Sequence, residues 1–66
     1  MFITVPPEEA HARLHACGWR LVDTLYDTVE VWRLPDSREV ILTPEFDNTG
    51  AYEDEMIKAA EALARR

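Results

Sequence analysis

The sequence contains little cysteine, little glycine and no long apolar run. A single cysteine, Cys17, excludes an internal disulfide and with it the class of disulfide-rich secreted mini-proteins. The two glycines, Gly18 and Gly50, form no glycine-rich phosphate-binding loop. The longest strongly apolar run, residues 40–42, is far shorter than the roughly 18–20 residues that cross a bilayer. Residues 1–7 lack the basic and apolar regions of a signal peptide, so we expect a cytoplasmic protein without membrane contact.

Basic residues are also scarce. Seven bases against 13 acids give a net charge of −6, whereas a protein that grips nucleic acid by its phosphates needs a basic face. The 66 residues are enough for one domain with a small core, and the hydrophobic fraction of 47% is typical of a folded chain. We therefore expect a single folded domain over residues 1–66 that does not bind nucleic acid directly.

The first half of the chain predicts a helix followed by a strand. Residues 6–9 (PPEE) are typical of a helix start, since proline is tolerated in the first turn and acids favour the positive end of the helix dipole. Gly18 suits the helix end, so the helix is predicted over residues 7–17. One apolar stripe follows this helix: Ala10, Leu14 and Cys17. Alternation then predicts a strand over residues 19–23.

The middle of the chain predicts a hairpin. A turn is expected at residues 25–27, followed by the clearest strand, residues 28–34 (TVEVWRL), which is rich in β-branched and aromatic residues. Residues 35–38 have turn chemistry, and residues 39–43 are the predicted return strand. Residues 2–5 alternate weakly, which leaves open a short extra strand at the N-terminus.

The last segment has the strongest helical period. Its expected buried stripe consists of Tyr52, Met56, Ala59, Ala60 and Leu63. The helix N-cap is expected at Asp47, Asn48 or Thr49, with acids at residues 53–55 in the first turns. The predicted fold class is α+β, with the order α-β-β-β-α, a three-stranded antiparallel sheet and both helices on one face of it.

The negative charge is local. Residues 39–57 contain six acids and no base, while the acids and bases of the remaining residues cancel. A solvated surface with acids at a helix start explains part of this segment. The other interpretation is a surface that occupies a basic, nucleic-acid-binding groove of a larger protein, aided by electrostatic attraction. The partner-binding residues predicted on this interpretation are Glu45, Asp47, Glu53, Asp54 and Glu55, with Asp23, Asp27 and Glu30 as extensions.

Other candidate sites are weaker. Glu8, His11 and His15 would share one face of the first helix and resemble metal ligands in spacing, but two exposed helix histidines are the favoured explanation. Cys17 belongs to an apolar stripe, and the two tryptophans, Trp19 and Trp32, lack surrounding lysines for base stacking, so all three are expected in or near the core. We expect no catalytic residue, no metal and no cofactor.

Three short segments resemble the HicA-type mRNA interferase toxins. They are residues 17–22 (CGWRLV), 31–36 (VWRLPD) and 40–44 (VILTP), and the resemblance covers residues 8–64. It implies a fold like that of a double-stranded-RNA-binding domain, with the same order of helices and strands. Where the family carries Gly-Ser-His with its catalytic histidine, this chain has Asp27, Thr28 and Val29. The resemblance therefore implies the fold without the nuclease activity.

In size and acidity the chain is also similar to phage anti-CRISPR proteins, a similarity of composition alone. The functional hypothesis is a small, non-enzymatic inhibitor or binding protein, a monomer or weak dimer, that mimics nucleic acid toward the basic surface of a nucleic-acid-binding protein. The alternative is a HicA-like toxin–antitoxin component that lacks the catalytic histidine.

Overall fold

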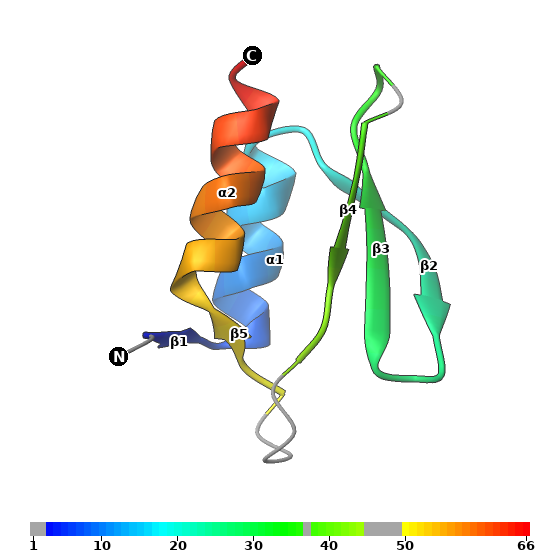
Figure 1. The fold of residues 1–66 in the computed structure, drawn as a ribbon, viewed down its shortest axis with the longest axis vertical. Coiled ribbons are helices and arrows are strands. Elements are labelled where there is room, and N and C mark those ends of the chain that lie inside the picture. The colour runs from blue at the N-terminus through cyan, green and yellow to red at the C-terminus, as the bar shows by residue number, and fades with distance from the viewer. Residues whose placement is uncertain (1–2, 37, 45–49) are drawn as a thin grey trace.

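A computed structural model describes residues 3–36, 38–44 and 50–66 of the chain. It has two helices, a three-stranded antiparallel sheet and a separate two-stranded sheet, within principal extents of 33 × 26 × 16 Å. Helices α1 and α2 stand side by side and run in the same direction, with the larger sheet beside them (Figure 1). The predicted α+β class and the order of helices and strands are confirmed.

Helix α1 spans Pro7–Ala16, close to the predicted range. Its start has proline in the first turn, where a missing N–H costs nothing. Its end follows from Gly18, whose φ of +94° is in the left-handed region that glycine adopts without strain. The N–H of Gly18 donates to the carbonyl of His15 at 3.0 Å and ends the helix as the sequence predicts.

The larger sheet has the order β2-β3-β4, with β2 at Arg20–Leu25, β3 at Val29–Arg33 and β4 at Glu39–Leu42. Tyr26 and Asp27 between β2 and β3 have φ of 56° and 59°, the signature of a type I′ turn, whose twist matches that of the flanking strands. A register shift interrupts β2 next to Leu21. The predicted three-stranded meander is confirmed, with strand bounds that differ by one or two residues.

The smaller sheet pairs β1, Thr4–Val5, with β5, Tyr52–Glu53. The short N-terminal strand that the sequence left open is therefore present, whereas β5 was not predicted. Helix α2 spans Asp54–Ala64 with Glu53 at the N-cap position, so the N-cap predicted at Asp47, Asn48 or Thr49 is wrong. Backbone pairing with β1 holds residues 52–53 extended and delays the helix start.

The core lies between the helices and the inner face of the sheet. It contains Trp19 and Trp32, each 1% exposed, as predicted for the tryptophans. The other large members, all less than 2% exposed, are Leu14, Leu42, Tyr52 and Ile57. Cys17 is partly buried and packs against this core. Two details of the α2 stripe are wrong: Tyr52 belongs to β5, and Ala59 is exposed while Ile57 is buried.

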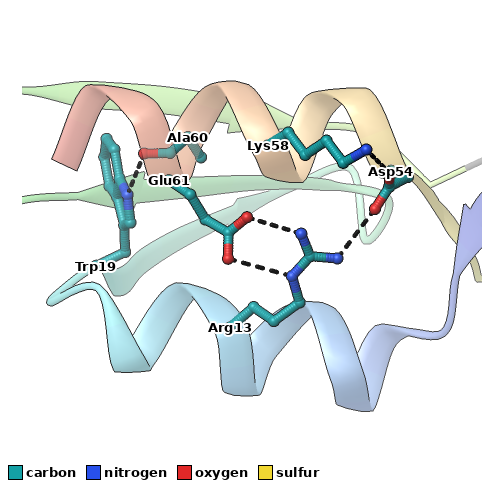
Figure 2. A network of polar contacts seen from close by, with 6 residues as sticks. All are labelled: Arg13, Trp19, Asp54, Lys58, Ala60 and Glu61. Carbon is teal, nitrogen blue, oxygen red and sulfur yellow. Dashed lines mark hydrogen bonds and ion pairs between the residues drawn. The ribbon is translucent and has the colours of Figure 1, made fainter. Parts of the chain in front are cut away.

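Polar contacts join the two helices (Figure 2). The Arg13 guanidinium donates from Nε and Nη2 to the two carboxylate oxygens of Glu61 at 3.2 and 2.7 Å, and from Nη1 to Asp54 at 3.0 Å. Farther along, the Trp19 indole N–H donates to the buried carbonyl of Ala60 at 3.0 Å. These contacts fix the helices in a defined register.

Neither helix in the described part of the chain is long and apolar enough to cross a membrane.

Candidate protein-binding surface

The pairing of β1 with β5 brings the starts of both helices together. Thr4 lies opposite Glu53, and α1 begins only two residues after β1, while α2 follows β5 directly. The N–H of Asp54 also donates to the carbonyl of Ile3 at 2.6 Å. Both helices consequently begin at the same end of the molecule, as Figure 1 shows.

This arrangement gathers acids from two distant parts of the sequence. Glu8 and Glu9 are in the first turn of α1, and Glu55 is in the first turn of α2, next to Glu53 at its N-cap. Three of these side chains are exposed and Glu53 is half-buried. None of the four has an ion pair among the described residues. We call Glu8, Glu9, Glu53 and Glu55 the acidic end.

Asp54 is at the same helix start but is already neutralised. Its carboxylate lies 3.0 Å from Nη1 of Arg13 and 2.8 Å from Nζ of Lys58, and its side chain is 13% exposed. The hydrogen bonds from Lys58 and from Arg13 lower the pKa of Asp54. Asp54 therefore contributes little to the field outside the molecule, and it orders the helix start that carries its neighbours.

The other predicted partner-binding acids are spread more widely. Asp23 is exposed in the edge strand β2, and Asp27 is exposed in the turn between β2 and β3, which lies toward the same end as the helix starts (Figure 1). Glu45 and Asp47 lie outside the described residues. Among the described members of the predicted set, Glu53 and Glu55 share the start of α2 and have no ion pair.

Glu30 has an internal role. Its Oε1 accepts a hydrogen bond from the Trp32 indole at 3.1 Å and lies 3.1 Å from Nε2 of His11. Burial and a hydrogen bond with Glu30 raise the pKa of Tyr52, so the phenol stays protonated in this cluster. The Glu30 side chain is only 17% exposed. Its carboxylate is occupied between the sheet and α1 and is not offered to a partner.

The histidines of α1 are likewise engaged with the sheet. The ring of His11 lies 5.2 Å from that of Trp32, and the ring of His15 lies 5.3 Å from it on centroids. Within residues 3–36, 38–44 and 50–66, no group of three His, Cys, Asp or Glu side chains could hold a metal ion. Glu8, His11 and His15 do not come together as a ligand set.

The contribution of Glu8 and Glu9 to this surface is not predicted from the sequence. In the sequence both indicate a helix start, and Glu8 is also a candidate metal ligand, but nothing local links either of them to residues 53–55. The one available signal was the weak alternation of residues 2–5, since a strand there needs a partner strand to supply its hydrogen bonds.

Comparisons of the chain with protein-family models, curated proteins and solved structures find no match. The resemblance to the HicA family therefore rests on the quoted residues alone, and the site has to be interpreted from its own geometry.

Proposed function

We propose that the protein is a non-enzymatic binding protein whose acidic end occupies a basic, nucleic-acid-binding groove of a larger protein. The observation that carries the proposal is the acidic end itself: four carboxylates without an ion pair in the described part of the chain, on two helix starts that a short sheet holds together. Phage counter-defence, as by an anti-CRISPR protein, is the concrete biological form of this activity.

The charge balance at this end favours an outward-facing negative field. Each helix start contributes roughly half a positive charge from its dipole, so two starts offset about one of the four carboxylates. Asp54 adds nothing further, because Arg13 and Lys58 neutralise it. The remaining charge of about −3 is larger than helix-dipole compensation requires, and such a field speeds encounter with a basic groove.

Rigidity supports the same function. A groove that binds phosphates at fixed spacing is best occupied by carboxylates that are fixed before binding, because ordering side chains and loops on binding costs affinity. At the acidic end the backbone is held by the β1–β5 pairing, and the Arg13 contacts hold α1 against α2. The surface is therefore preorganised at the backbone level.

The test is a competition experiment. The protein on beads captures a partner from a lysate of its natural host, and duplex DNA is then added as the competitor. We expect DNA and raised salt to release the partner. A fourfold variant should capture no partner while its circular dichroism is unchanged; its substitutions are Glu8→Gln, Glu9→Gln, Glu53→Gln and Glu55→Gln. Asp23→Asn is a control for an exposed acid away from the helix starts. Equal capture by the fourfold variant contradicts the proposal.

A second candidate, a HicA-like toxin–antitoxin component without the catalytic histidine, is favoured by the order α-β-β-β-α of the main elements. It predicts binding to structured RNA. Gel shifts at low salt distinguish the two, because an acidic mimic is repelled by RNA. Tight RNA binding that survives in the fourfold variant would replace the first proposal with the second.

A further inference from the structure

Two surface hollows meet at Arg20, at the end of α1 away from the acidic end. The first, of about 270 Å³, is lined by His15, Gly18, Trp19 and Arg20. The second, of about 350 Å³, is lined by Arg20, Val22, Arg33, Leu34 and Pro35. Arg20 is thus the residue common to a polar hollow next to the end of α1 and a more apolar hollow next to the strands.

Arg20 differs from Arg13, Arg33 and Arg38 in having no acidic partner among the residues that the structure describes. Arg13 binds Glu61 and Asp54, Arg33 binds Glu39, and Arg38 binds Asp36 and a carbonyl of α2. No ion pair or side-chain hydrogen bond is formed by Arg20 within the described ranges. Its guanidinium has five N–H donors, and none of them is used by another side chain of the described residues.

The register of the sheet makes this arrangement costly without a counter-ion. Arg20 lies directly opposite Arg33 across β2 and β3. Like charges in directly opposed positions destabilise a sheet pair. Glu39, opposite Arg33 on β4, neutralises only one of the two. The row Arg20–Arg33–Glu39 therefore has one uncompensated positive charge, at Arg20.

The C-terminal end of α1, the negative end of its helix dipole, lies near this site. It repels an anion less strongly than an uncapped helix end would. The carbonyls of Arg13 and Leu14 accept hydrogen bonds from the N–H of Cys17, and that of Leu14 also from Trp19. Gly18 donates to the carbonyl of His15. With these carbonyl groups capped, the negative end of the helix dipole is partly satisfied within the chain.

We propose that Arg20 binds an oxyanion, the phosphate or carboxylate group of a ligand whose apolar part lies against Val22, Leu34 and Pro35. The guanidinium is suited to oxyanions because its planar donors match two oxygens at once. His15 borders the polar hollow and can donate a further hydrogen bond. The site is separate from the acidic end, so it does not depend on the function proposed there.

The experiment uses phenyl phosphate and phenylacetate as probes of the two anion types, titrated separately into the ¹⁵N-labelled protein. We expect saturable amide shifts confined to residues 15–22, 33 and 34, since Pro35 has no backbone N–H. Arg20→Gln should raise the dissociation constant at least about tenfold. Arg66→Gln removes an exposed arginine that forms no ion pair with any described residue, and it is the matched control, expected to leave the constant unchanged.

The outcomes separate clearly. Tighter binding of phenyl phosphate identifies a phosphorylated ligand, and tighter binding of phenylacetate identifies a carboxylate. Equal weakening by Arg20→Gln and Arg66→Gln would mean general attraction of anions and would overturn the site. Shifts that do not saturate for either probe would overturn it as well. Unchanged circular dichroism of Arg20→Gln shows that a loss of binding is not a loss of fold.

Discussion

The contact between Arg13 and Glu61 is expected to be a principal polar contribution to the packing of the two helices. Two parallel hydrogen bonds, 3.2 and 2.7 Å long, join the guanidinium to the carboxylate, and the side chains are only 27% and 19% exposed. Exposed ion pairs contribute about 0.2–1 kcal/mol, and hydrogen bonds to charged groups about 1.5–3 kcal/mol. For this partly buried, bidentate pair we expect a coupling energy of about 1–2 kcal/mol.

The assay is a double-mutant cycle of Arg13→Gln, Glu61→Gln and the double variant, with urea unfolding followed by circular dichroism and tryptophan fluorescence. A chain of this length is expected to have a free energy of unfolding of about 3–10 kcal/mol, so the pair is a large fraction of it. Each kcal/mol lost should lower Tm by about 4–8 °C. Arg66→Gln is the control. A coupling energy below about 0.3 kcal/mol would refute the reasoning, because additive losses mean no interaction.

The same pair predicts a pH dependence. The hydrogen bonds from Arg13 lower the pKa of Glu61 below its ordinary 4.5, and Lys58 and Arg13 lower that of Asp54. A lowered pKa in the folded state gives stability that is present above the unfolded value and is lost as pH falls through the folded one. The stability difference between wild type and Arg13→Gln should therefore be full above about pH 5 and shrink toward pH 2. A stability difference between wild type and Arg13→Gln that does not change with pH would contradict the lowered pKa values of Glu61 and Asp54.

Three further predictions concern single groups. Trp19→Phe leaves the Ala60 carbonyl without its buried hydrogen bond and should cost about 2 kcal/mol in urea unfolding. Gly18→Ala should cost about 1 kcal/mol, because the φ of +94° strains any residue with a Cβ, and a cost near zero would contradict this. Burial raises the pKa of Tyr52 above its ordinary 10. The contribution of the buried, protonated phenol to the free energy of unfolding is therefore full below about pH 10 and is lost as the pH rises above it. In Tyr26→Phe, which has one tyrosine left, phenolate absorbance near 295 nm should appear only well above pH 10.

The sequence was sufficient for the parts of the fold with local causes. Proline at the start and Gly18 at the end predicted α1 to within a residue. The β-branched and aromatic residues of 28–34 predicted β3, and the turn chemistry of residues 35–38 predicted the hairpin that follows. These signals are local because capping, backbone restriction and strand preference act over a few residues.

The parts that were missed have causes far away in the chain. Strand β5 is two residues long and exists because β1, about 48 residues earlier, supplies its hydrogen bonds. That pairing moved the start of α2 to Asp54 and took Tyr52 out of the helical stripe. The pairing of Arg13 with Glu61 was likewise not predictable from the sequence, since no hydrophobic periodicity or sequence motif indicates which charged residues form ion pairs.

The same long-range pairing changes what the negative charge means. In sequence, the excess of acids belongs to residues 39–57. In space, Glu39 is paired with Arg33 and Asp54 with Arg13 and Lys58, so two acids of that segment lose their outward field. The β1–β5 sheet replaces them with Glu8 and Glu9, whose local sequence context indicated a helix start and, for Glu8, a candidate metal ligand, but no partner-binding surface. A partner that recognises the acidic end therefore recognises two helices in a fixed arrangement. Loss of that arrangement should abolish binding even at constant net charge, which distinguishes a structured mimic from a merely acidic peptide.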